Sequence, residues 1–279
     1  MTLNIRDLTP DELDEYKNKL RHNLKLFHDF CESHGLTYYL SDGTLLGAIR
    51  HQGMIPWDDD IDVCMPRQDY AKLEFLSHLI PSSLMLTSIT QTPDYIFPYL
   101  KISNVPQQYC EIVGGRTYVT GAWIDVFPLD GTYQNKTLRK LHYLLAKTIR
   151  SAFNIKTRGK NTILGKNTST LKKMLFFPSH TILKAIPLRL LFKLMDGIAQ
   201  HKSFDKAHVV GNLYTSIGIR ASHDKKIFSE KVKCLFDGMQ LYAPSGHHQY
   251  LKNLYGDYLT PPPASARQQH NIKIFNLPN

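Results

Sequence analysis

The most informative segment of the sequence is Ile55-Pro56-Trp57-Asp58-Asp59-Asp60-Ile61-Asp62-Val63. Its second half is typical of a β-strand, and the two-residue period of a strand turns Asp60 and Asp62 to one face and the apolar residues between and after them to the other. Two neighbouring carboxylates offer the oxygen ligands that suit Mg²⁺ or Mn²⁺, usually completed by phosphate oxygens and water. The stretch therefore predicts a divalent metal site on a strand.

A third carboxylate is expected from a neighbouring strand. Asp125, in Trp123-Ile124-Asp125-Val126-Phe127, is flanked by apolar residues on both sides, and a buried unpaired charge is too costly to keep without a cation. The competing interpretation is that Asp58-Asp59-Asp60 is a solvated acidic turn after Pro56, but this does not explain Asp62 or Asp125. A calcium loop of the EF-hand type is excluded, because the stretch lacks the required glycine and final glutamate.

The turn Ser41-Asp42-Gly43-Thr44 lies about fifteen residues before the acidic stretch. It connects an expected strand to an expected helix, whose free N–H groups form a phosphate site. Ser41 and Thr44 add hydroxyl donors, and Gly43 closes the turn. By itself the motif is equally an ordinary turn, but a phosphate cradle ahead of an Asp-x-Asp strand is the arrangement that phosphoryl transfer with bridging metal needs.

Elements of both kinds surround these motifs. A helix begins at Thr9-Pro10-Asp11-Glu12, which has a capping threonine, a proline at the first helical position and a glutamate three residues after the cap. Further helices are expected at 45–50, from 66 and over 245–255, strands at 36–40, 84–89, 96–102 and 118–128, and a hairpin at 232–242. The predicted fold class is α/β (α+β), with a mixed sheet flanked by helices.

The excess positive charge is confined to the middle of the chain. Residues 136–206 carry 16 Lys/Arg against two Asp, a balance of +14, whereas the rest carries 18 basic and 22 acidic residues, a balance of −4. An apolar stripe at 141, 145, 149 and 153 predicts a helix, and charges and prolines within the apolar run 174–195 argue against a spanning helix. Two interpretations stay open for this segment: contact with a membrane surface, or burial against the core.

The charge pattern and the expected elements together predict three parts: a core at 1–135 that carries the acidic motifs, a basic helical subdomain inserted at 136–228, and a hairpin and helix at 229–279 that complete the core. The four cysteines lie far apart and predict neither a zinc site nor a disulfide framework. The N-terminus shows no apolar signal segment. We therefore expect a cytoplasmic protein, and peripheral contact with the inner face of a membrane is the alternative that stays open.

The sequence from Tyr39 to His51, followed by Ile55 to Val63, closely resembles the signature of the LicD family of phosphotransferases, relatives of fukutin and fukutin-related protein. The segment from Ile124 to Asp130 is similar to the second acidic block of that family, and the segment from Tyr250 to Tyr258 is similar to its C-terminal signature. The resemblance covers residues 10–130 well and 230–270 moderately, and covers the basic middle poorly.

This resemblance implies a nucleotidyltransferase-like fold in which Asp60, Asp62 and Asp125 are catalytic and hold Mg²⁺ or Mn²⁺, with Asp58 in support. Gly43 and Thr44 would position the donor phosphates. Members of the family are similar in taking CDP-linked alcohols, such as CDP-choline or CDP-ribitol, and passing the phospho-alcohol to a surface glycan while CMP leaves. The implied partners are a CDP-alcohol donor and a lipid-linked or surface glycan acceptor.

Four more side chains are candidates for donor binding. Lys101, on an expected strand, and Arg50 are candidate phosphate contacts, although such side chains are commonly solvated. Trp57 and Tyr39 are candidates to stack on the base or on the choline, for which an aromatic cage is suited, or else to belong to the core.

Several alternatives remain open. CDP-ribitol or CDP-glycerol is an alternative donor to CDP-choline, and a nucleotidyltransferase would leave the nucleotide on the acceptor. A structural metal-binding domain would gain stability from metal without turnover. A nucleic-acid-binding protein would bind through the basic segment with salt-sensitive affinity. Nucleic acid is disfavoured, because the basic residues alternate with leucine and isoleucine, which favours a membrane or a lipid-linked acceptor.

Overall fold

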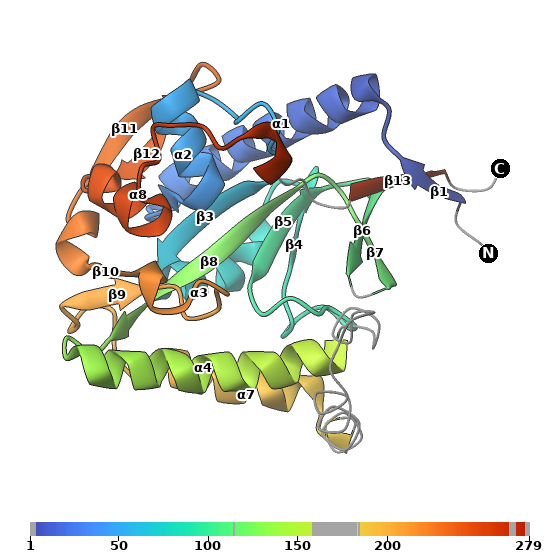
Figure 1. Cartoon of the computed structure of the whole chain (residues 1–279). Helices are drawn as coiled ribbons and strands as arrows, with labels where there is room; N and C mark the ends of the chain where they lie inside the picture. The colour runs from blue at the N-terminus through green and yellow to red at the C-terminus, as the bar shows by residue number, and fades with distance from the viewer. Residues whose placement is uncertain (1–3, 114, 158–182, 184, 268–271, 277–279) are drawn as a thin grey trace.

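The computed structural model describes residues 4–113, 115–157, 183, 185–267 and 272–276. Its centre is a mixed, seven-stranded sheet, as the sequence predicts (Figure 1). The strands of this sheet are β2 (Tyr39–Leu40), β3 (Ile61–Pro66), β4 (Leu84–Thr87), β5 (Leu100–Asn104), β8 (Trp123–Thr132), β9 (Val209–Gly211) and β10 (Ser222–Asp224).

The long strand β8 organises this sheet, because β3, β5 and β9 all pair with it. β3 is parallel to β8, whereas β5 and β9 are antiparallel to it; β2 extends the sheet beyond β3, and β4 extends it beyond β5. Ile61 and Val63 of β3 and Ile124 of β8 are completely buried. Parallel strands are usually covered on both faces. On β3 and β8, the apolar residues that alternate with the aspartates form the buried face.

Helix α1 (Pro10–Ser33) packs on the sheet through one apolar face and begins where the sequence predicts. The Thr9 hydroxyl accepts a hydrogen bond from the Glu12 N–H (3.3 Å), and the Glu12 carboxylate accepts one from the Thr9 N–H (2.9 Å). Its completely buried apolar residues include Tyr16, Leu20 and Leu24. From the same helix, Lys17 Nζ donates to the Pro56 carbonyl (2.8 Å), which ties α1 to the loop before the acidic stretch.

The helix expected from residue 66 is α3 (Arg67–Phe75), and it continues into a short 3-10 helix, η1 (Leu76–Leu79). Three further 3-10 helices occur in the second half of the described chain. They are η2 (Gly218–Ala221), η3 (Lys225–Phe228) and η4 (Ala264–Ala266).

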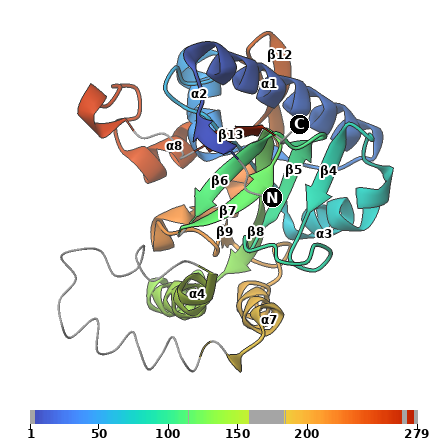
Figure 2. The ribbon, with the colours of Figure 1, turned by 90° about the vertical axis from the view of Figure 1, so that its right-hand side faces the viewer.

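A second, four-stranded sheet joins the first and the last described strands (Figure 2). In order, it contains β1 (Asn4–Asp7), β13 (Ile272–Asn276), β6 (Tyr109–Val113) and β7 (Arg116–Thr120). The single strand expected over 118–128 is wrong, because β7 and β8 belong to different sheets and the chain turns between them at 121–122. A side chain at Gly121 would lie 2.2 Å from the Asn104 carbonyl oxygen, so this close approach requires glycine.

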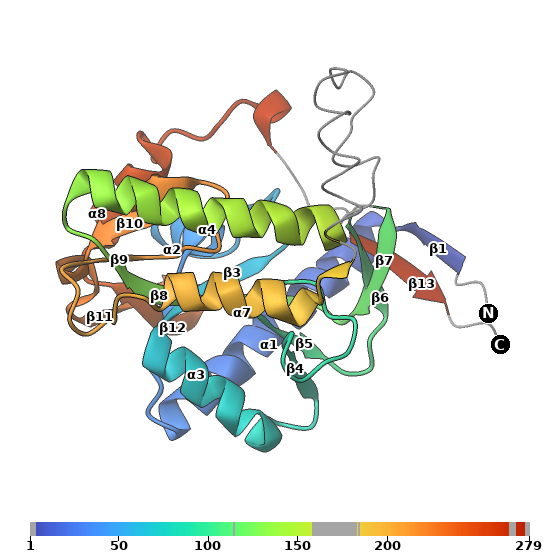
Figure 3. The same ribbon diagram turned by 90° about the horizontal axis from the view of Figure 1, so that it is seen from below.

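Two helices from the basic middle, α4 (Lys136–Thr157) and α7 (Leu188–Ala199), lie side by side on one face of the molecule (Figure 3). Tyr143, Ala146 and Met195 form a small buried cluster with their neighbours. The helix predicted from the apolar stripe is confirmed, but only Phe153 of the stripe is completely buried, whereas Leu141 and Leu145 are half exposed.

Part of the basic middle lies outside the residues that the structure describes. The expected apolar run 174–195 is described at 183 and 185–195 only, and its remaining residues lie outside the described part of the chain. A separate basic subdomain at 136–228 stays a prediction. No described helix is both long and apolar enough to cross a bilayer: α7 has 12 residues, and the 22 residues of α4 include six Lys/Arg.

The C-terminal part contains the expected hairpin and helix. The strands β11 (Lys231–Phe236) and β12 (Met239–Pro244) meet at Asp237 and Gly238, both with positive φ, as a two-residue hairpin turn requires. Helix α8 (His247–Tyr255) packs against α2 (Asp42–His51). Leu241 and Leu251 are completely buried in the main core, so this part contributes to the same core as α1 and β3.

Candidate active site

A row of charged side chains crosses three adjacent strands of the main sheet. The register pairs Asp62 of β3 with Asp125 of β8, and Asp125 with Lys101 of β5. Side chains directly opposite one another across a sheet share a face. Asp60 precedes β3 by one residue, and one carboxylate oxygen from each of Asp60, Asp62 and Asp125 lies within 4.8 Å of the others. The predicted convergence of three aspartates is therefore present.

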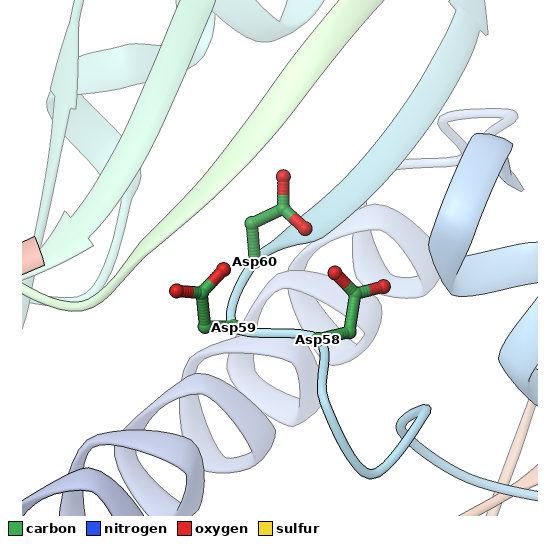
Figure 4. Close-up of side chains that lie close together, drawn as sticks. All are labelled: Asp58, Asp59 and Asp60. Carbon is green, nitrogen blue, oxygen red and sulfur yellow. The ribbon is translucent and has the colours of Figure 1, made fainter. Parts of the chain in front are cut away.

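The loop before β3 carries a second acidic group. Carboxylate oxygens of Asp58, Asp59 and Asp60 also lie within 4.8 Å of one another (Figure 4). Asp59 is buried, and its negative charge acts on Lys17 of α1, whose ammonium holds the Pro56 carbonyl of the same loop. Asp60 belongs to both groups, so it lies at the end of the row that Asp62 of β3 and Asp125 of β8 form.

Crowding of these carboxylates has an electrostatic cost. Burial, together with the neighbouring Asp60 and Asp42 carboxylates, raises the pKa of Asp62 well above its usual range. Burial likewise raises the pKa of Asp42 to about 6. A bound divalent cation would offset this repulsion, and the donors of the group are all carboxylate oxygens, which fit Mg²⁺ or Mn²⁺ better than a softer metal. The residues present therefore fit a hard divalent metal ion.

Lys101 is engaged with carboxylates from two strands. Its ammonium lies 3.1 Å from Asp125 Oδ1 and 3.2 Å from Glu111 Oε2, and it is also 4.2 Å from the ring centroid of Trp123. Burial lowers the pKa of Lys101, but the attraction of Asp125 and Glu111 outweighs it, so the pKa is raised. The side chain is 5% exposed. Its partners in this structure are carboxylates, whereas the sequence suggested a donor phosphate.

The turn at the start of α2 is built as a support for the acidic loop. Thr44 Oγ1 accepts a hydrogen bond from the Asp62 backbone N–H (2.8 Å), and Ser41 is completely buried. A Cβ at Gly43 would lie 2.7 Å from Asp58 Oδ2, so the missing side chain makes room for that carboxylate at the helix N-terminus. Asp42 has a φ of +45°, in the left-handed region that is rare for residues other than glycine.

Arg50 and Trp57 contact the C-terminal part of the chain. Arg50 Nη1 donates to the Tyr258 carbonyl (2.8 Å), and its guanidinium lies 5.9 Å from the Trp57 ring. Arg267 lies 4.0 Å from the same ring. Tyr39 donates its hydroxyl to the Phe228 carbonyl (3.1 Å) and is buried in the core. The contact of Arg50 with Tyr258 joins the two segments that resemble family signatures. A donor contact for Arg50 and Trp57 stays a prediction.

A cavity of about 640 Å³ opens over the row of aspartates. Asp60, Asp62 and Asp125 line it, and the carboxylates of Asp42 and Glu111 join them. Its walls include the aromatic residues Phe97, Tyr99, Phe127 and Tyr214, and Arg150, Asn154 and Thr157 of α4. The cavity is therefore acidic at its base, aromatic on one wall and polar where α4 borders it.

The sequence did not indicate several of these lining residues. Asp42 lies within the turn that the sequence singles out, but only the glycine and the hydroxyl groups of that turn were predicted to bind the donor. Glu111 is on β6, a strand without a clear period in the sequence. The rings of Phe97 and Tyr99 lie in irregular chain just before β5, and their spacing of two residues was attributed to a strand that begins only at Leu100.

Comparison with known proteins agrees with this geometry. Residues 35–144 match the family model described as LicD/FKTN/FKRP, nucleotidyltransferase domain. This range includes the α2 turn, the acidic loop, β3 and β8, and it ends within α4. The chain is 27% identical over 257 residues to the lipopolysaccharide cholinephosphotransferase LicD of Haemophilus influenzae, an alignment that covers 90% of this chain and 92% of that protein.

Two further relatives match over shorter stretches. The chain is 39% identical over 57 residues to the ribitol 5-phosphate transferase FKRP of Homo sapiens, which covers 20% of this chain and 12% of that protein. It is 34% identical over 83 residues to mannosyltransferase regulator 4 of Saccharomyces cerevisiae, covering 30% of this chain and 7% of that protein. Residues 35–144 therefore match the nucleotidyltransferase domain of the LicD/FKTN/FKRP family, and LicD and FKRP are relatives named as transferases of phosphorus-containing groups.

Proposed function

We propose that the protein transfers phosphocholine from CDP-choline to a sugar hydroxyl of a cell-surface glycan precursor, releasing CMP. The observation that carries the proposal is the row of Asp60, Asp62 and Asp125 at the base of a cavity with an aromatic wall. The cholinephosphotransferase named above, which aligns over most of both chains, supports the reaction class.

Different residues of the chain have different roles in the proposed reaction. Asp60, Asp62 and Asp125 would hold a divalent cation, which when bound would neutralise charge on the diphosphate and on the CMP leaving group. Arg150 lines the same cavity and contributes positive charge to the electrostatic environment of the donor. Asp42 lines the cavity outside the metal group, and we assign it the proton of the acceptor hydroxyl, which attacks the β-phosphorus in line.

Lys101 acts through Asp125 in this proposal. The ion pairs with Asp125 and Glu111 fix the position of the Asp125 carboxylate on the sheet. A ligand held by a neighbouring group loses less freedom when the cation binds, and such supporting contacts are as important for a metal site as the ligands themselves. Lys101 is thus a positioning residue for the metal site.

The aromatic wall favours choline among the possible alcohols. The ring centroids of Tyr99 and Phe127 are 4.6 Å apart and those of Phe97 and Tyr99 are 5.7 Å apart, so the rings form one continuous surface. Aromatic faces attract quaternary ammonium groups, and the nearby carboxylates reinforce that attraction. Ribitol and glycerol carry no charge and offer hydroxyl groups, which gain little from aromatic faces.

Product analysis tests the proposal. The protein would be incubated with Mg²⁺, a lipid-linked glycan and, in separate reactions, CDP-choline, CDP-ribitol and CDP-glycerol. We expect CMP to appear in equal amount to phosphocholine on the acceptor, and D62N and D125N to abolish transfer. D29N, on the exposed side of α1, is the matched control. Nucleotide found on the acceptor, or transfer with CDP-ribitol alone, would refute the proposed reaction or the proposed donor, respectively.

A further inference from the structure

Six leucines on α4 and α7 are exposed to an unusual degree. Each residue is between 46% and 57% exposed, and together we call them the leucine face. Its members are Leu138, Leu141, Leu144, Leu145, Leu190 and Leu194. Large apolar patches are rare on soluble monomers and mark contact surfaces when they are contiguous.

The two helices lie side by side (Figure 3), and Leu138, Leu141, Leu145 and Leu194 line the same groove between them. On α4, positions 138, 141 and 145 follow the spacing of one helical face, and on α7 positions 190 and 194 are one turn apart. The groove has a volume of about 460 Å³, and Lys193 and His201 also line it. The groove is separate from the aspartate cavity.

Positive charge borders the leucine face. Helix α4 carries six Lys/Arg and no Asp/Glu, and Lys140 and Lys147 are exposed close to the leucines. On α7, Arg189 and Lys193 are exposed. The acidic residue of α7, Asp196, is held by Arg67 of α3 at 3.1 Å. The exposed charge around the leucines is therefore basic.

The exposed leucines and the basic residues around them together fit one kind of partner. A second copy of the chain, docked face to face, would bring lysines opposite lysines. A nucleic acid would gain nothing from leucine side chains. An anionic bilayer satisfies both properties, because leucines enter the boundary of the acyl chains while Lys and Arg reach the acidic headgroups. We propose that the leucine face of α4 and α7 docks the protein on the surface of an anionic lipid bilayer.

Co-sedimentation with vesicles tests this surface without any donor, acceptor or turnover, so its result is independent of the proposed reaction. The probes are vesicles of phosphatidylcholine and phosphatidylglycerol in equal parts, and vesicles of phosphatidylcholine alone. The triple variant L141Q/L145Q/L194Q removes apolar contact, and K140Q/K147Q/K193Q removes charge. L79Q/L259Q is the matched control, since both leucines are similarly exposed on other parts of the molecule. Melting curves verify that each variant is folded.

We expect the wild-type protein and the control variant to bind the anionic vesicles. The leucine variant should bind on the order of a hundredfold more weakly, since each half-exposed leucine contributes roughly fivefold. The lysine variant should lose on the order of a hundredfold as well, and high salt should weaken wild-type binding. Failure of the wild type to bind, or an equal loss in the control variant, would overturn the proposal. So would a wild-type dimer that the leucine substitutions convert to a monomer without affecting vesicle binding.

Discussion

Replacing Lys101 with methionine removes a buried cation while keeping the volume of the side chain nearly unchanged. Two unit charges 3.1 Å apart, as in the pair with Asp125, attract with about 5 kcal/mol at an effective dielectric constant of about 20. The pair with Glu111 at 3.2 Å adds a similar attraction, and the cost of burying the ammonium opposes both. Removing one partner from buried pairs costs about 3–5 kcal/mol, because the remaining charge is left uncompensated. We expect K101M to lower the free energy of unfolding by about 4 kcal/mol.

Urea unfolding followed by circular dichroism measures this loss. K101R keeps the charge and should recover part of the stability, whereas K25M, which removes the exposed pair of Lys25 with Asp29, should change it by less than about 0.5 kcal/mol. Mg²⁺ should stabilise K101M less than the wild type, because the Asp125 carboxylate is then no longer held in position for the cation. If K101M unfolds within about 1 kcal/mol of the wild type, the ion pairs do not hold this sheet together and the positioning role is refuted.

Three other substitutions test separate parts of the structure. D130N should lower the free energy of unfolding by about 3 kcal/mol, because the buried Asp130 carboxylate accepts two hydrogen bonds from Arg67 at 2.7 and 2.5 Å. Urea unfolding measures this loss of stability, and a change below about 1 kcal/mol would contradict the reasoning. G43A should leave stability nearly unchanged but lower the transfer rate roughly tenfold to a hundredfold, because the new Cβ displaces the Asp58 carboxylate. An unchanged transfer rate would argue against a role for that carboxylate. Burial lowers the pKa of His223 from 6.5 to about 4, so the unfolded chain takes up a proton below pH 6.5 while the folded one does not, and stability is lost as the pH falls from 6.5 to 4. H223Q should lack this loss of about 3 kcal/mol, and parallel pH profiles for the two proteins would refute it.

The three converging aspartates could be predicted from the sequence because their placement depends on local rules. The two-residue period of a strand determines which side chains share a face, and it put Asp60 and Asp62 together without knowledge of the sheet. Asp125 followed from the cost of burying a lone carboxylate between apolar neighbours. The structure confirms that the three converge, and adds that Asp60 lies in the loop just before the strand.

The role of Lys101 could not be predicted in the same way, because it depends on the register between strands. The pairing of Lys101 with Asp125 joins residues from β5 and β8, and their alignment is fixed by packing of the whole sheet. The pairing of β1 with β13 was missed for a similar reason. It joins segments from opposite ends of the chain, and four- or five-residue strands carry too short a pattern to be recognised alone.

The basic middle shows a different limit of sequence reasoning. The apolar stripe correctly predicted a helix, since the period of the stripe is a local property, but a stripe does not say what covers it. The structure divides it: Phe153 is buried in the core, whereas Leu141 and Leu145 remain exposed beside α7. Of the two interpretations left open by the sequence, burial applies to Phe153, and contact with a membrane stays a proposal for the exposed part of the same helix.

Helix α4 joins the proposed membrane surface to the proposed catalytic cavity. Arg150 lines the cavity, and it is separated from Leu141 by about two and a half turns, which puts the two side chains on opposite sides of the helix. An α-helix with its side chains is about 10 Å wide, so docking would hold the cavity close to the lipid surface. A glycan anchored in the same bilayer would then reach the cavity at a high effective concentration. We expect anionic vesicles to raise kcat/KM at least tenfold for a lipid-linked acceptor and to leave it unchanged for the same glycan without its lipid. L141Q/L145Q/L194Q should remove this difference while keeping the rate with the lipid-free glycan. An equal stimulation of both acceptors would show that vesicles act on the enzyme in another way.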